Sequence, residues 1–114
     1  MVTTYLPDYG DIIWLVLDPR VGHEQSGRRP ALVISNKEFS DHTNLAVVCP
    51  ITSKVKSLPF EIQLKSTKTK GVVLPIHVKS IDWNTRKVKF IEKAPQDITS
   101  IVTQSVGAII GLEI

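Results

Sequence analysis

A series of short apolar, β-rich segments separated by turn-forming residues most constrains the fold of this chain. Pro, Gly, Asn or Asp stands at most of the breaks between the segments. A series of this kind predicts a compact, strongly bent sheet or a small barrel. The predicted strands are residues 12–17, 29–35, 45–51, 60–64, 72–74, 78–81 and 86–92, and the polar connection 36–44 is expected to hold one short helical turn.

The C-terminal segment has a different pattern. Pro95 suits the first position of a helix, apolar residues follow at helical spacing, and Gly111 provides a stop. We therefore predict one helix over residues 95–110 that packs on the barrel, and a mostly β fold class, a β-rich α+β protein. The face expected to be buried consists of Ile98, Ile101, Val102, Ser105 and Ile109.

Length and composition are those of a small globular protein. We expect all 114 residues to form one domain, 1–114, with a core of its own. No apolar run approaches the roughly 18 residues of a membrane span, and the N-terminus lacks the basic-then-apolar order of a signal peptide, so we expect a cytoplasmic location. Cys49 has no cysteine partner and is expected to be a core residue. The three histidines are scattered without metal-ligand spacing, so we expect no metal and no other cofactor.

Positive charge is concentrated in the second half of the chain. Residues 50–93 carry ten Lys or Arg against three acids, a net charge of +7, whereas the segment on each side carries −2. Such a block favours a polyanionic partner, either nucleic acid or an acidic protein segment, because neutralising many charges together releases counterions. For any single lysine, an ordinary solvated surface position is the simpler interpretation.

Residues 22–35 are the strongest candidate for a functional segment. Glycines at both ends of 22–27 permit a loop that exposes Glu24, and Arg28 and Arg29 follow it. Pro30 favours an extended backbone at Arg29, which therefore lies where a loop becomes a buried strand. That is a common place for a catalytic side chain. The alternative is that Glu24 and an arginine form a surface ion pair of little consequence.

Five sequence blocks resemble the MazF/PemK toxins of bacterial toxin–antitoxin pairs. They occur in the family's order and at its spacing across nearly the whole chain. The blocks are PDYGDIIW at residues 7–14, GHEQSGRRPA at 22–31, PITS at 50–53, PFE at 59–61 and VKSIDW at 78–83.

The resemblance implies an SH3-like barrel (MazF/PemK/CcdB-like) with a C-terminal helix. It also implies a homodimer, an acidic antitoxin partner like MazE, and sequence-specific, metal-independent cleavage of single-stranded RNA. Attack by the 2′-hydroxyl would give a 2′,3′-cyclic phosphate and a 5′-hydroxyl. Two positions depart from the family pattern: Arg28 stands where known members carry histidine, and Ile76-His77 stands where Asp-Gln is common.

Such cleavage needs a base for the 2′-hydroxyl proton, cations for the charge on phosphorus and an acid for the leaving oxygen. The resemblance assigns catalytic roles to Arg29 and Thr52, and Glu24 is the best carboxylate for the base. Arg28 is a poor proton donor at neutral pH. The further residues expected to bind RNA are His23, Gln25, Arg28, Ser53, Lys54, Lys56, His77 and Lys79.

Two other functions remain open from the sequence. One is a CcdB-like toxin of the same fold that poisons DNA gyrase without cleaving nucleic acid. The other is a non-catalytic RNA-binding barrel, for which an aromatic content of 6% is thin, since such proteins stack bases on aromatic rings.

Overall fold

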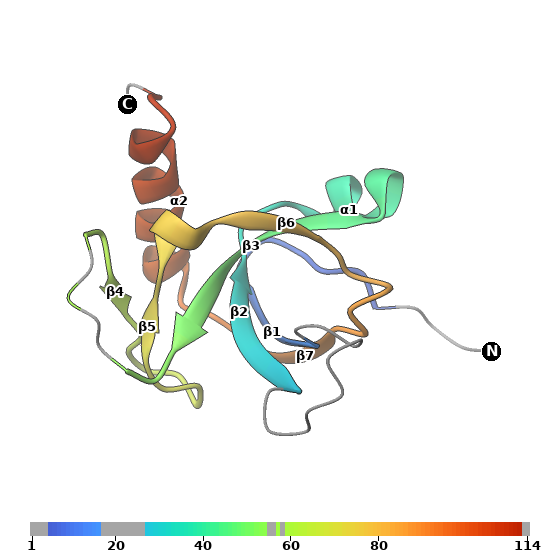
Figure 1. The fold of residues 1–114 in the computed structure, drawn as a ribbon, viewed down its shortest axis with the longest axis horizontal. Coiled ribbons are helices and arrows are strands. Elements are labelled where there is room, and N and C mark those ends of the chain that lie inside the picture. Colours follow the sequence, from blue (N-terminus) through green and yellow to red (C-terminus); the bar gives the residue numbers. More distant parts are fainter. Residues whose placement is uncertain (1–4, 17–26, 55–56, 58, 113–114) are drawn as a thin grey trace.

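The computed structural model describes residues 5–16, 27–54, 57 and 59–112 (Figure 1). The described elements are mostly strands, and the one long helix comes last, which confirms the predicted fold class. In chain order they are β1 (Asp11–Val16), β2 (Arg28–Val33), α1 (Lys37–Thr43), β3 (Leu45–Thr52), β4 (Ile62–Gln63), β5 (Val72–Val73), the 3-10 helix η2 (Pro75–His77), β6 (Lys79–Asp82), β7 (Lys89–Lys93) and α2 (Gln96–Ile109).

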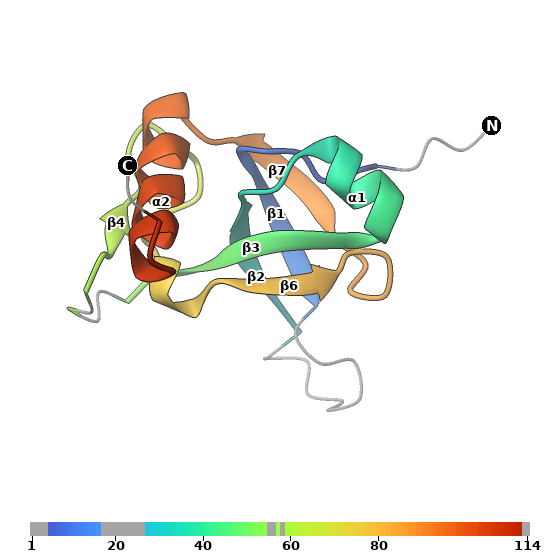
Figure 2. The same ribbon diagram turned by 90° about the horizontal axis from the view of Figure 1, so that it is seen from above.

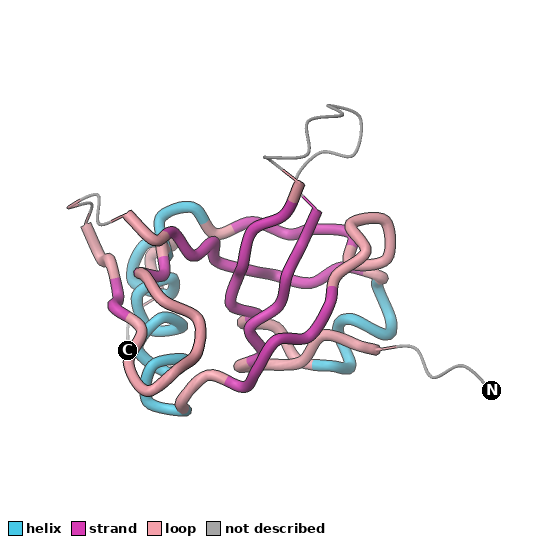
Figure 3. Tube along the Cα trace, turned by 90° about the horizontal axis from the view of Figure 1, so that it is seen from below, coloured by secondary structure: helices cyan, strands magenta, loops and turns pink. Residues whose placement is uncertain are grey.

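The strands form one antiparallel sheet that curls into a half-barrel, as predicted. Its order is β4-β5-β3-β2-β1-β7, and β6 pairs with β3 away from this path. β3 is the central strand: β2 lies along one edge, while β6 pairs with residues 45–48 and β5 with residues 51–52 along the other. The curl is seen from above in Figure 2 and from below in Figure 3, where the strands wrap around a common centre.

Both faces of the central strands are buried. Ile12, Leu32 and Cys49 belong to an apolar cluster that includes residues of α2, whereas Ile13 and Val33 belong to a second cluster on the opposite face. Successive side chains of a strand point to opposite faces, so a strand covered on both sides has no polar positions to alternate with. This is why these strands look like continuous apolar runs in the sequence. Cys49 is fully buried, as predicted.

Helix α2 packs on the sheet with a face slightly different from the predicted one. The prediction was wrong for Ile101 and Ile109, which are 47% and 39% exposed, and Ser105 is half-buried. The helix carries apolar residues on two neighbouring faces, and periodicity alone does not say which of them meets the sheet. The buried residues of α2 are Ile98, Thr99, Val102, Val106 and Gly107.

Among the described residues, neither α2 nor any shorter helix has the length and apolar character that a membrane-spanning segment requires.

Helix α1 lies at the end of the sheet opposite α2 (Figures 1 and 2). The Asn36 side chain caps it by accepting a hydrogen bond from the Phe39 amide at 2.9 Å, and Asn44 ends it in the left-handed conformation at φ 64°. With both caps present, the polar connection forms a helix of seven residues, longer than the single turn predicted. The indole of Trp83 donates to the Ser40 carbonyl at 3.0 Å and holds the helix on the sheet.

The strand predicted at residues 60–64 is shorter than expected. Phe60 has φ 67° and its side chain is 49% exposed, so it does not share the buried face of Leu64. β4 is limited to two residues because the chain enters it from an irregular segment, and only Ile62 and Gln63 pair with β5. The alternating pattern correctly predicted a strand at Ile62 and Gln63 and a buried side chain at Leu64, but it wrongly included Phe60 in the strand.

The strand predicted at residues 86–92 begins later, at Lys89, because a capped turn precedes it. The Asp82 carboxylate accepts the amide hydrogens of Thr85 at 2.9 Å and Asn84 at 3.0 Å. These hydrogen bonds, with the Thr85 amide foremost, lower the pKa of Asp82. Lys87 then adopts φ 51° before β7 starts.

An acidic residue of β1 neutralises one lysine of the basic block. Asp11 is 4% exposed, and its carboxylate lies 2.7 Å from the Lys93 ammonium of β7. The same carboxylate accepts the Tyr5 hydroxyl and, at 3.0 Å, the Asp8 amide. Lys93 also donates to the Tyr9 carbonyl at 3.0 Å. Lys93 therefore stabilises the start of the sheet and contributes less to an anion-binding surface than the count of charges implies.

Candidate active-site pocket

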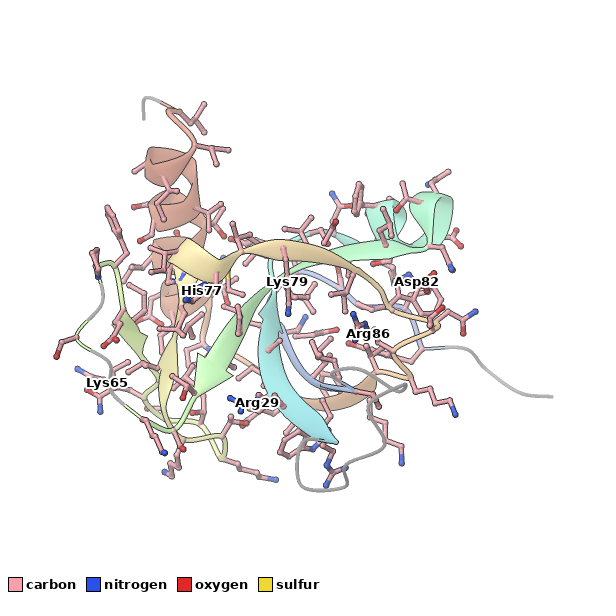
Figure 4. All side chains as sticks on the ribbon, viewed as in Figure 1. Arg29, Lys65, His77, Lys79, Asp82 and Arg86 are labelled. Carbon is pink, nitrogen blue, oxygen red and sulfur yellow. The ribbon has the colours of Figure 1, made fainter. Side chains whose placement is uncertain are left out.

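Arg29 stands at the open end of the sheet, where β2 begins. It pairs with Leu15 of β1, and its side chain is exposed although the strand is buried from Ala31 onward. Pro30 follows it and keeps the backbone extended, as the sequence predicted. Figure 4 shows Arg29 on the lower side of the view. The guanidinium is thus carried by an ordered strand and not by a free loop.

Thr52 ends β3 close to the same place. Its residue is 9% exposed, and its hydroxyl oxygen accepts the Lys54 amide hydrogen at 3.2 Å. A hydroxyl accepts and donates at once, so this hydrogen bond orients the oxygen and leaves the O–H proton for a bound group. The turn that it stabilises leads into the exposed residues Ser53 and Lys54.

These strand ends line one pocket of about 760 Å³, a size suited to a small ligand or to part of a polymer. Four of the described lining residues are cationic and none is acidic, so the pocket attracts anions. Hydroxyl-bearing and apolar side chains supply the remaining walls. The lining residues are Trp14, Arg29, Pro30, Ile51, Thr52, Ser53, Lys54, Lys68, Thr69, Lys70 and Ile91.

Lys68, Thr69 and Lys70 were not among the site residues predicted from the sequence, where the two lysines were counted only in the basic block 50–93. The sheet explains their place. β5 follows the connection 66–71 and pairs with the end of β3, with Val72 opposite Thr52. This pairing brings the connection beside the pocket. The lysine pair just before Gly71 was the only signal in the sequence, and its position depended on a strand pairing that the sequence does not specify.

Two titratable side chains with strongly raised pKa values, Cys49 and Tyr5, are not chemically active groups. Burial raises the pKa of the Cys49 thiol to about 12, so the thiolate nucleophile is not available at neutral pH. Burial, together with its hydrogen bond to Asp11, also raises the pKa of Tyr5 far above its ordinary value. Within the described part of the chain, no three His, Cys, Asp or Glu side chains come together as metal ligands. Among the described lining residues, the groups able to act on a bound anion are the four cations and the hydroxyls of Thr52, Ser53 and Thr69.

The family profile described as PemK-like, MazF-like toxin of type II toxin–antitoxin system matches residues 8–110. The chain belongs to this family.

Relatives of the PemK/MazF family resemble the chain over almost its full length. It is 38% identical over 112 residues to the endoribonuclease toxin MazF of Escherichia coli strain K12, covering 97% of this chain and all of the relative. A crystal structure of MazF from Deinococcus radiodurans is 41% identical with a TM-score of 0.84. A MazE-MazF crystal structure from the same organism is 38% identical with a TM-score of 0.87. Both structural matches cover 96% of this chain and 100% of the matched chain.

The structure brings together only part of the RNA-binding set predicted from the PemK/MazF resemblance. Ser53 and Lys54 line the pocket with Arg29 and Thr52. His77 and Lys79 are exposed but do not line it, and Figure 4 shows both higher in the view than Arg29. Arg28 lies beside the pocket on Trp14, one of its lining residues. The predicted residues His23, Glu24, Gln25 and Lys56 lie outside the described residues.

Proposed function

We propose that the protein is a sequence-specific endoribonuclease toxin that cleaves single-stranded RNA without a metal ion. The observation that carries this proposal is the convergence of Arg29 and Thr52 on one cationic pocket. Those are the two residues to which the family resemblance assigns catalysis. The E. coli relative is named an endoribonuclease toxin, and the pocket has the charge that a phosphodiester requires.

In the proposed reaction, the ribose 2′-hydroxyl attacks the adjacent phosphorus. The bond between phosphorus and the 5′-oxygen breaks, the departing oxygen takes a proton from water, and the products are a 2′,3′-cyclic phosphate and a 5′-hydroxyl. Arg29 binds two phosphate oxygens with its planar fork and stabilises the charge that develops on them. Thr52 donates a hydrogen bond from its hydroxyl to the same phosphate. Glu24, assigned from the sequence, takes the 2′-hydroxyl proton.

The relatives also suggest the partners of this protein. A homodimer would place two basic pockets on one particle, which suits a polymeric substrate. The MazE-MazF crystal structure motivates an acidic antitoxin like MazE as the inhibitor. Toxin and antitoxin are then proposed to meet in the cytoplasm, where messenger RNA is accessible.

The test is incubation of purified protein with a long single-stranded RNA in EDTA. Discrete cuts with 5′-hydroxyl ends are expected from the wild type. Arg29→Ala is expected to abolish cleavage without unfolding the protein, because the exposed guanidinium stabilises the transition state more than it stabilises the core. The control is Lys37→Ala, which removes an exposed cation outside the basic block and should cleave at the wild-type rate. Wild-type binding without cuts would indicate an RNA-binding barrel, and gyrase inhibition without cuts would indicate a CcdB-like toxin.

A further inference from the structure

The loop 67–70 between β4 and β5 is held in shape by its own hydrogen bonds. The Thr67 hydroxyl donates to the Thr69 carbonyl at 2.6 Å, and the Lys70 ammonium approaches the Thr67 carbonyl at 3.4 Å. The loop supplies Lys68, Thr69 and Lys70 to the pocket, hence two of its four cations. The position of this short loop therefore sets half of the positive charge that faces a ligand.

Glu92 of β7 fixes this loop from a distant part of the chain. One carboxylate oxygen accepts the Lys68 amide hydrogen at 3.0 Å. The other accepts both the amide hydrogen of Thr69 at 2.7 Å and its hydroxyl hydrogen at 2.8 Å. Hydrogen bonds to a carboxylate are about twice as strong as those between neutral groups, and here three of them join two segments that the sequence separates by more than twenty residues.

The ionised form of Glu92 is the one that these contacts favour. Partial burial alone would raise its pKa, but the hydrogen bonds from Lys68 and Thr69 outweigh burial and lower the pKa below its ordinary value of 4.5. At neutral pH the side chain is therefore a carboxylate that only accepts hydrogen bonds. It is not among the residues that line the pocket, so it acts on a ligand through the loop.

Gly71 fixes the loop where it joins β5. Its φ is +126°, and a Cβ added there would lie 2.1 Å from the Thr52 carbonyl oxygen. The loop backbone is thus pressed directly against the residue proposed to donate to the phosphate. A change at Gly71 would shift Thr52, whereas Glu92 holds the other end of the loop, at Lys68 and Thr69.

We propose that Glu92 is a positioning residue that holds the loop 67–70 so that Lys68 and Lys70 bind the RNA backbone in the pocket of Arg29. The proposal rests on the proposed function and deepens it, because it adds two lysines to the substrate-binding surface and a carboxylate that places them. The negative charge of Glu92 by itself repels the phosphates of RNA. The attraction of the two lysines that Glu92 positions offsets this repulsion.

The sign of one effect tests this proposal. Glu92→Gln keeps the size of the side chain but removes its charge and replaces one acceptor oxygen by a donor. If Glu92 were merely a nearby negative charge, its removal would lower KM for RNA. Positioning predicts the opposite: KM rises roughly tenfold, the scale of a lost charged hydrogen bond, while kcat stays within about twofold. Glu38→Gln, an exposed charge on α1, is the control and should leave both constants unchanged.

A double-mutant cycle asks whether Glu92 acts through the lysines. In the Lys68→Ala, Lys70→Ala background, Glu92→Gln is expected to change KM by less than about twofold, because the groups that it places are gone. Both lysines are exposed, so the background variant should fold normally. An undiminished effect of Glu92→Gln in this background would overturn the assignment.

Amide hydrogen exchange gives a readout that needs no RNA. The Lys68 and Thr69 amides should exchange faster in Glu92→Gln than in the wild type, with no change for amides in β2. If wild type cleaves RNA while Glu92→Gln shows an unchanged or lower KM, or unchanged exchange at these amides, the positioning role is wrong and the proposed function stands. If the wild type does not cleave RNA at all, the proposed function itself fails, and the role of Glu92 in it fails with it.

Discussion

The Arg28 guanidinium lies over the indole ring of Trp14, 4.3 Å from the ring centroid. The register of β1 and β2 pairs Trp14 with Pro30, so Arg28 is the diagonal neighbour of Trp14 on the same face. Trp14 also lines the pocket. This tryptophan therefore holds an arginine at the edge of the proposed RNA site.

We predict that Arg28→Lys weakens RNA binding although it keeps the charge. A lysine loses the planar stacking on Trp14, so affinity should fall about two- to fivefold, the value of an exposed cation–π contact. Arg28→Ala should weaken binding further and lower the salt dependence by about one phosphate contact. Fluorescence anisotropy with an uncleavable 2′-O-methyl RNA at several salt concentrations measures both. Equal affinities for Arg28→Lys and wild type would show that only the charge matters.

The catalytic role proposed for the Thr52 hydroxyl can be tested with a pair of conservative changes. Thr52→Val removes the hydroxyl and leaves the Lys54 amide without its acceptor, whereas Thr52→Ser keeps both functions. We expect Thr52→Val to lower kcat about a hundredfold, the scale of losing one transition-state hydrogen bond, and less than Arg29→Ala does. Thr52→Ser should retain most activity. Single-turnover cleavage rates of the two variants measure this difference. Equal rates for the valine and serine variants would show that the Thr52 hydroxyl takes no part in cleavage.

Much of the fold could be predicted because local pattern and tertiary structure agree in this chain. Apolar runs such as 45–51 became central strands, and Pro95 and Gly111 bracket the C-terminal helix. Errors arose where the pattern allowed two answers. Ile101 and Ile109 share helical spacing with the true buried face, and only the position of the sheet distinguishes them. Phe60 continued an alternation that a left-handed backbone interrupts.

The candidate site was only half predictable, for a related reason. Arg29 and Thr52 lie in recognisable motifs at the ends of two strong strands. Lys68 and Lys70 reach the pocket only because a two-residue strand pairs with the end of β3, and Glu92 reaches their loop from β7. Contacts of this kind depend on register and topology, which short segments specify weakly. Lys79 was predicted to bind RNA and lies in the sequence block 78–83, but the fold does not bring it to the pocket.

Gly71 is predicted to tolerate no side chain. In Gly71→Ala the new Cβ would meet the Thr52 backbone, and φ of +126° is unfavourable for alanine. We expect a loss of at least about 2 kcal/mol in the free energy of unfolding, together with lower activity because Thr52 shifts. Gly111→Ala is the matched control: φ is +89°, but nothing lies within 4 Å of the added Cβ, so only the backbone strain remains, about 1 kcal/mol. Urea titration compares the two. Equal losses would mean that the contact with Thr52 is unimportant.

The lowered pKa of Glu92 predicts a loss of stability in acid. A carboxyl group whose pKa is lower in the folded state stabilises the protein above its unfolded pKa, and that stabilisation is lost as the pH falls through the folded pKa. The wild type should therefore lose part of its stability as the pH falls below 4.5, the ordinary value for this group. Glu92→Gln should be less stable than wild type near neutral pH, and the difference should shrink in acid. Thermal unfolding across pH, with Glu38→Gln as control, measures this. A constant difference would show that the charge is not involved.

The last prediction concerns the inhibitor, which we expect to compete with RNA for the basic pocket. Residues 50–93 carry a net charge of +7, and Lys54, Lys68 and Lys70 line one pocket with Arg29. An acidic, largely disordered antitoxin segment resembles RNA electrostatically. Ordering such a segment on binding costs conformational entropy. Charge pairing should therefore supply much of its encounter rate, and a few apolar anchors should supply the remaining affinity.

Association with such an antitoxin should therefore slow as salt rises, and 2′-O-methyl RNA should displace it. The Lys68→Ala, Lys70→Ala variant should show a smaller salt dependence for both ligands, whereas Lys37→Ala should not, because Lys37 lies outside the basic block. Stopped-flow association rates across salt concentrations, with competition by the RNA analogue, measure these effects. Salt-independent association, or simultaneous binding of both ligands, would place the inhibitor elsewhere on the protein and leave this pocket to RNA alone.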